Sequence, residues 1–155
     1  THMADIVTDT DGAHGLKIQE GTFTPTVIGS SVAGTQTYSS AWGQYKKINN
    51  MVFFQLYVSM TAKDPAMAGS VCIGGLPFTP AKKAFGVRGV SIGRVIGIDT
   101  AKTGVIDVNG AIISNEPAIR MYFIVNKATS TTQEYLGVSE IIDEFDIGLS
   151  GFYEV

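Results

Sequence analysis

Apolar and polar residues alternate along most of the chain, in short runs that predict β-strands rather than helices. Breaks rich in Gly, Pro, Asn and Asp separate the runs. The predicted strands are 22–28, 35–39, 43–48, 51–61, 70–74, 85–93, 94–99, 104–108, 111–114, 118–126 and 145–155. Residues 135–144 fit either a short helix or a further strand.

The dipeptide Asn109-Gly110 lies between two of these runs. It predicts a two-residue hairpin, because type I′ turns require positive φ at both central positions. Many short strands at this spacing are typical of an all-β protein. We therefore expect an antiparallel β-sandwich.

Two strands carry apolar residues on both faces. In 51–61 the second face holds Phe53 and Tyr57, and in 118–126 it holds Tyr122 and Ile124. A solvated face of an antiparallel sheet is usually polar. Either a second sheet layer or another subunit could cover these residues. We prefer an interface between copies of the chain, because large apolar patches are uncommon on monomers.

Glycine recurs in the run from 85 to 99, at Gly89, Gly93 and Gly97. Glycines in strands mark bulges, bends or places where another backbone approaches closely. Bulges or tight sheet packing are the favoured interpretation. Close packing near an oligomer axis is the alternative.

The composition mainly serves to exclude other kinds of fold and partner. The 155 residues contain 16 Ile, 15 Thr and 14 Val but five Leu, which favours sheet over helix. The net charge is −3 and the basic residues are scattered, so we expect no nucleic-acid partner. No apolar run is long enough for a membrane span, and we expect no membrane insertion.

The N-terminal residues differ from the rest. Residues 1–3 are typical of a cloning remnant, and 4–20 lack periodicity and suggest a linker from an upstream module. We expect the β-sandwich domain to occupy 21–155.

Candidate chemistry is sparse. Cys72 and His14 are isolated in the sequence, and neither a nucleotide-binding loop nor a nucleophile elbow is present. Asp143, Glu144 and Asp146 could form a calcium site or paired glycosidase carboxylates, but an exposed acidic turn is the simpler interpretation. We therefore expect a protein that is not an enzyme and uses no cofactor or metal.

Binding residues are easier to suggest. Trp42 and Tyr38 offer aromatic faces of the kind that cover the C–H surface of a sugar. Asn126, Lys127 and Gln133 belong to a polar segment that could form a variable binding loop. The simpler alternatives are a core or interface aromatic and a solvated connection.

Several segments resemble one known family. These segments are 21–27, Tyr38, 43–54, 74–78 and 145–153. In this order and spacing they resemble the C-terminal domain of bacteriophage tailspike and tail fibre proteins of the capsule-depolymerase type. Trp42 departs from the family pattern, since a polar or aliphatic residue is expected there.

The resemblance implies a jelly-roll β-sandwich that assembles as a homotrimer at the virion tail. It further implies binding of bacterial surface polysaccharide, with any cleavage belonging to an upstream shaft. A structural trimerisation cap without ligand binding is the main alternative, and a small glycan-active hydrolase is a weaker one.

Overall fold

The computed structural model describes residues 7–8, 16–82, 87–99, 105–113, 118–127 and 130–155. For residues 7–8, 87–88, 105–106, 122–127 and 130–133 it describes the backbone alone. The elements are β1 (Val7–Thr8), β2 (Lys17–Phe23), β3 (Thr26–Gly29), β4 (Thr37–Ile48), β5 (Met51–Ala62), β6 (Val71–Gly74), β7 (Val87–Ile98), β8 (Val105–Ile113), β9 (Ile119–Lys127), β10 (Ser130–Tyr135), the 3-10 helix η1 (Val138–Glu140) and β11 (Ile141–Glu154).

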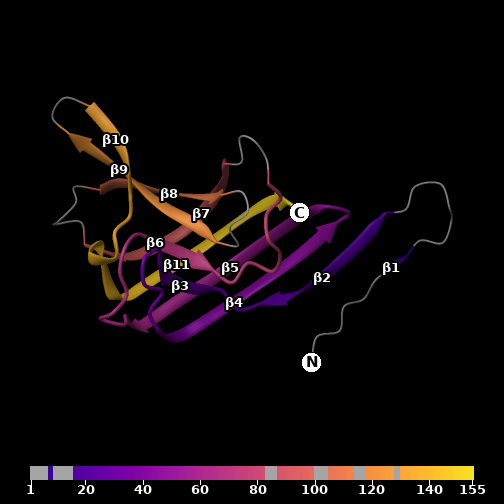
Figure 1. Ribbon diagram of the computed structural model, residues 1–155, viewed down its shortest axis with the longest axis horizontal. Helices are drawn as coiled ribbons and strands as arrows, with labels where there is room; N and C mark the ends of the chain where they lie inside the picture. The colour runs from indigo at the N-terminus through magenta and orange to yellow at the C-terminus, as the bar shows by residue number, and fades with distance from the viewer. Residues whose placement is uncertain (1–6, 9–15, 83–86, 100–104, 114–117, 128–129) are drawn as a thin grey trace.

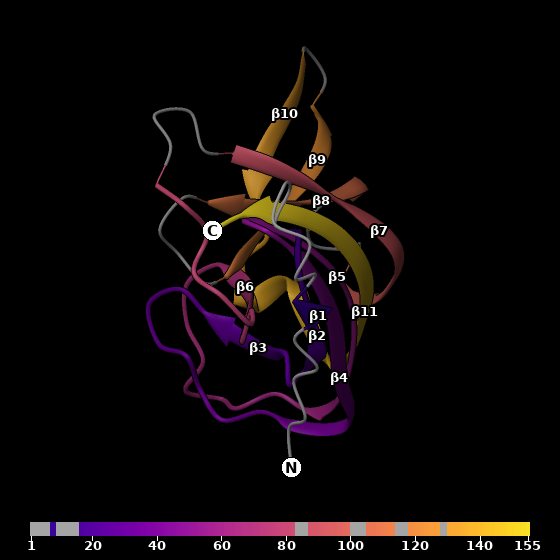
Figure 2. The same cartoon turned by 90° about the vertical axis from the view of Figure 1, so that its right-hand side faces the viewer.

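The described strands form one antiparallel sheet in the order β1-β2-β4-β5-β11-β7-β8-β9-β6-β3, with β10 paired to β9. Strands β2 and β3 stand near opposite ends of this path, yet only Thr24 and Pro25 separate them in the chain. The sheet must therefore curl back on itself, as Figures 1 and 2 show. The predicted all-β, antiparallel class is confirmed, while the jelly-roll sandwich stays a prediction.

The core fills the concave side of the curled sheet. Its largest fully buried side chains include Tyr153, Phe145 and Met60. Tyr38 on β4 helps to close the curl, because its hydroxyl accepts from the Val27 backbone N–H at 2.9 Å and lies 3.3 Å from the Val27 carbonyl, to which it donates. Burial raises the pKa of this hydroxyl. The two ends of the sheet are thus joined by side-chain contacts as well as by the chain.

Strands β4 and β5 form a tight hairpin at Asn49-Asn50, where a break is predicted. Ile48 pairs directly with Met51, so the loop has two residues. Asn49 has φ of 55°, in the left-handed region that asparagine tolerates better than most residues. This turn fixes which residues of the two strands face each other.

The hairpin predicted at Asn109-Gly110 is wrong. β8 continues through both residues, and Asn109 pairs with Tyr122 while Gly110 pairs with Met121. A Cβ on Gly110 would lie 2.6 Å from Cγ2 of Val90 on β7. The glycine therefore makes room for a neighbouring strand and does not form a turn.

Two glycines of β7 do mark irregularities, which confirms the bulge interpretation. Arg94 pairs with Gly148 and Ile92 with Leu149, so Gly93 is an extra residue in β7. Gly97 has φ of +86°, and a Cβ there would lie 2.5 Å from the carbonyl oxygen of Glu144. The described parts of the runs predicted as 85–93 and 94–99 accordingly form one bent strand, β7.

Other segments also differ from the prediction. The expected polar loop around 127–133 is largely strand, since Lys127 pairs with Ser130 in the β9–β10 hairpin, which projects from the body in Figures 1 and 2. Residues 135–144 contain the last residue of β10, the 3-10 helix η1 and the beginning of β11. Part of the expected linker is ordered sheet, because β2 begins at Lys17.

Candidate functional site

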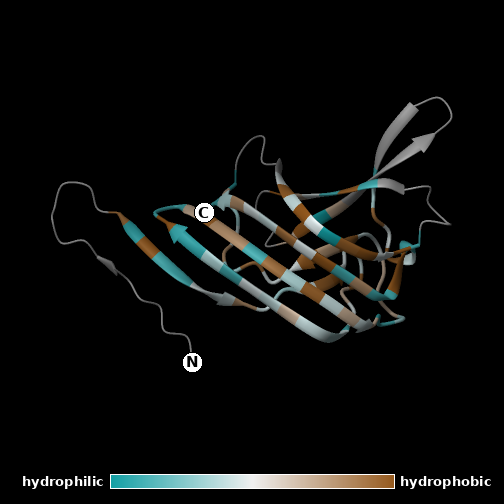
Figure 3. Cartoon of the chain, turned by 180° about the vertical axis from the view of Figure 1, so that it is seen from behind, coloured by the Kyte–Doolittle hydropathy of each residue, from teal (hydrophilic) through white to brown (hydrophobic). Residues whose placement is uncertain are grey.

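The outer face of the curled sheet is the face opposite the core. On β5, Val52, Leu56 and Val58 are buried in the core, whereas Phe53 is 45% exposed and Tyr57 is half-buried. The alternation predicted for this strand is confirmed. Figure 3 views the sheet from behind and shows hydrophobic and hydrophilic residues alternating along its strands.

The strand registers align the outward residues in rows across the sheet. The rows are Glu20–Lys46–Phe53–Phe152, Thr22–Gln44–Gln55–Ser150–Ser91, Trp42–Tyr57–Gly148–Arg94 and Ser40–Ser59–Asp146–Ile96. Successive rows are two residues apart, about 7 Å along the strands. The outer face thus alternates aromatic rows with polar ones.

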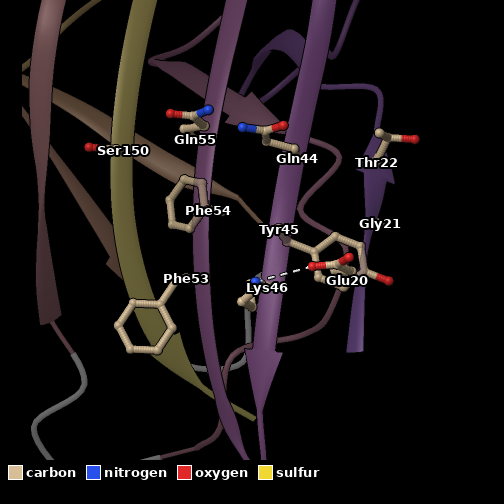
Figure 4. A pocket seen from close by; sticks show the side chains of 10 residues that line it. All are labelled: Glu20, Gly21, Thr22, Gln44, Tyr45, Lys46, Phe53, Phe54, Gln55 and Ser150. Atoms are coloured by element: carbon tan, nitrogen blue, oxygen red, sulfur yellow. Dashed lines mark ion pairs between the residues drawn. The ribbon is translucent and has the colours of Figure 1, made fainter. Parts of the chain in front are cut away.

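An open groove crosses β2, β4, β5 and β11 on this face and encloses about 730 Å³. Figure 4 shows the groove and its lining residues, Glu20, Gly21, Thr22, Gln44, Tyr45, Lys46, Phe53, Phe54, Gln55 and Ser150. The two glutamines face each other across β4 and β5. Their amides can each donate and accept hydrogen bonds at the groove floor.

One end of the groove is aromatic and charged. The rings of Phe53 and Phe152 lie 6.0 Å apart, and Phe152 is 53% exposed. Lys46 and Glu20 form an ion pair at 3.2 Å, with both side chains more than half exposed. Such an exposed pair adds little stability to the fold, so its charges are available to a ligand.

Trp42, a candidate from the sequence, lies on the same face. Its side chain is 48% exposed, and its ring centroid is 6.5 Å from that of Tyr57. The Tyr57 hydroxyl donates to Oδ2 of Asp146 at 3.4 Å, and Nη2 of Arg94 donates to the same oxygen at 3.3 Å. The structure therefore brings Trp42 together with three polar partners that the sequence analysis did not group with it.

The side chain of Asp146 is only 17% exposed, yet it is held as a carboxylate. Hydrogen bonding from Ser59 lowers its pKa most, and Arg94 and Tyr57 lower it further, while burial opposes them. This keeps a strong acceptor on the outer face beside the Arg94 guanidinium.

The other candidate residues fall into two groups. Tyr38 is used inside the fold, through its contacts with Val27. The side chains of the remaining candidates lie outside the part of the structure that is described. These are the ligand candidates Asn126, Lys127 and Gln133 and the interface candidates Tyr122 and Ile124.

The acidic residues near β11 do not converge on one point. Asp143 and Glu144 are exposed, and Oδ1 of Asp143 accepts from the Lys63 backbone N–H at 3.2 Å. Among the described residues, no three His, Cys, Asp or Glu side chains are placed to hold a metal ion. Cys72 is buried on β6, and His2 and His14 lie outside the described residues.

The described part of the chain contains no helix that is both long and apolar enough to cross a membrane.

Comparison with solved structures gives one informative likeness. The chain is similar to the crystal structure of the Dettilon tailspike protein (gp208), with a TM-score of 0.67 and 20% sequence identity. The chain shares its fold with part of a phage tailspike. The likeness covers 88% of this chain but 24% of that protein. No protein-family model and no curated protein sequence matches the chain.

This likeness supports the tailspike part of the resemblance seen in the sequence. A position at the C-terminus and a depolymerase type of parent protein both stay predictions.

The glutamine pair, Phe152 and Arg94 were not predicted as site residues from the sequence. A usable signal was present for the pair, since a two-residue turn at Asn49-Asn50 places Gln44 opposite Gln55 and Trp42 opposite Tyr57. The positions of Phe152 and Arg94 on this face could not be predicted, because their partners come from strands distant in the sequence.

Proposed function

We propose that the chain is a non-catalytic module of a phage tail that binds a polysaccharide on the host surface. The groove on the outer face carries this proposal. Its two glutamine amides, Gln44 and Gln55, lie one row from the exposed ring of Trp42, and sugars are held by aromatic faces together with planar polar groups. The fold shared with a tailspike protein supports the location at the virion tail.

We further propose that the module works as a homotrimer. Phe53 and Phe152 support this, because two half-exposed phenylalanines side by side form an apolar patch at the edge of the groove. Cyclic assembly closes such patches between copies without leaving an open end. A trimerisation cap without sugar affinity is the second candidate, and it rests on the same patch.

Two measurements on the full chain test the proposal. The first is binding of the chain to an array of purified bacterial surface polysaccharides, where retention on at least one is expected. If the chain binds no polysaccharide on the array, the trimerisation cap without sugar affinity is the favoured function. The second is the mass in solution by light scattering at micromolar concentration, where three copies are expected and a monomer would overturn the assembly.

A further inference from the structure

A gap in one row of the outer face is bordered by the three side chains of that row. Tyr57, Gly148 and Arg94 are aligned on β5, β11 and β7, and Trp42 precedes them on β4. Because glycine has no side chain, β11 contributes nothing to this row. Gly148 is half-buried between Tyr57 and Arg94, whose side chains both reach Oδ2 of Asp146 on β11. We call the surface over Gly148, between these two side chains and beside Trp42, the Gly148 notch.

The fold does not require glycine at position 148. Its φ is not in the left-handed region, unlike that of Gly97. A Cβ there would lie 3.5 Å from Cδ2 of Tyr57 and 3.8 Å from Cβ of Arg94, which is ordinary contact. At Gly43, by contrast, a Cβ would lie 2.4 Å from the Phe23 ring. Glycine therefore leaves the notch without a β11 side chain, although no internal clash requires glycine there.

The chemistry around the notch is both aromatic and polar. The Trp42 ring is half exposed, and the Arg94 side chain is 53% exposed. Asp146, the preceding outward residue of β11, accepts from both Tyr57 and Arg94. A strong donor and a strong acceptor thus lie next to each other beside aromatic rings.

We propose that the Gly148 notch binds one neutral hexopyranosyl unit of a surface polysaccharide. The proposal rests on the proposed function and names the sugar class and the place. A pyranose has an apolar C–H face for the aromatic rings and hydroxyl edges that can both accept from Arg94 and donate to Asp146. The sugar hydroxyls replace the water that the Arg94–Asp146 pair loses on binding. This limits the free-energy cost of desolvating the pair.

A neutral sugar suits the notch better than the alternatives. The charge of Arg94 is already paired with Asp146 at 3.3 Å, and the carboxylate of a uronic acid would approach Asp146 and be repelled. A second protein chain seated here would bury an ion pair without new partners for it, which is unfavourable.

The single tryptophan gives a local probe, because all indole emission comes from Trp42. The chain is titrated with maltotetraose, mannotetraose and galactotetraose, and with tetragalacturonate as the acidic arm. At least one neutral tetrasaccharide is expected to change the emission in a saturable way. Gly148→Leu, which fills the notch, is expected to weaken that sugar's binding at least tenfold.

Gly89→Leu is the matched control. It adds the same side chain to the exposed surface of β7, where a Cβ would meet no atom within 4 Å, and is expected to leave the affinity unchanged. Thermal unfolding checks that both variants fold. If Gly148→Leu fails to fold, Arg94→Gln provides an independent test. It alters a half-exposed side chain and is expected to weaken binding of the same sugar at least threefold.

The outcomes separate this proposal from the proposed function. The notch is excluded if the chain is retained on the polysaccharide array while the neutral tetrasaccharides leave Trp42 emission unchanged. Equal affinity of Gly148→Leu and the unaltered chain, or tighter binding of tetragalacturonate than of every neutral sugar, would also overturn it. If the chain binds no polysaccharide on the array, both the proposed polysaccharide binding and the proposed sugar site at the Gly148 notch are excluded.

Discussion

Replacing Phe53 by Ser removes half of the exposed apolar patch that we assign to assembly. A phenylalanine side chain offers roughly 200 Å², and Phe53 and Phe152 are 45% and 53% exposed. Each ring therefore has about 100 Å² left to bury against a neighbouring copy. At about 25 cal/mol per Å² this amounts to roughly 2.5 kcal/mol for each ring, which is about a 70-fold change in the dissociation constant of one such contact.

The assay is sedimentation or light scattering over a range of concentrations. Phe53→Ser is expected to shift the concentration of half-assembly upward by about 70-fold, with little change in thermal unfolding of the isolated chain because the ring is half exposed there. Ile142→Ser is the matched control, since Ile142 is 47% exposed on β11 but lies ten residues from Phe152. If the control dissociates as readily as Phe53→Ser, the patch is not the contact between copies.

Two further predictions concern the core. Gly110→Ala places a Cβ 2.6 Å from Val90 and is expected to destabilise the fold by about 1–3 kcal/mol, whereas Gly148→Ala is expected to be neutral or slightly stabilising in the same thermal unfolding measurement. Burial raises the pKa of Tyr153 to about 12. The stability this residue contributes is therefore complete below the unfolded pKa of about 10 and is lost between pH 10 and 12. Tyr153→Phe should unfold with a shallower dependence on pH in that window, and identical slopes would contradict the assignment.

Local pattern was sufficient for the class and for most strands. Alternation in β5 correctly separates Val52 and Leu56 from Phe53, because a side chain's face depends only on its position in the pleat. Asn109-Gly110 shows the limit of such reasoning. The dipeptide favours a turn, but the close approach of Val90 from a distant strand requires glycine within a continuous strand.

The candidate site shows the same limit more strongly. Trp42 could be selected as a candidate binding aromatic from its sequence context, but Asp146 and Arg94 join it only through the pairing of β5, β11 and β7. Those strands are far apart in the chain, and a bulge at Gly93 shifts the register between them. The periodicity of a single strand does not reveal this change of register. The grouping of Arg94 with Tyr57 therefore could not be predicted.

The two proposed uses of the outer face can coexist because they occupy different rows. Phe53 and Tyr57 are four residues apart on β5, which separates the apolar patch from the Gly148 notch by about 13 Å. A neighbouring copy covering Phe53 and Phe152 would leave the Trp42 row open to solvent, and the glutamine row between them would border both contacts. Assembly could then support sugar binding by placing a second chain at the end of the groove. On this arrangement Phe53→Ser should alter the mass of the assembly without abolishing the Trp42 response, whereas Gly148→Leu should do the reverse. If one variant abolished both the assembly and the Trp42 response, the apolar patch and the Gly148 notch would be a single contact between copies. The sugar would then have to bind elsewhere on the chain.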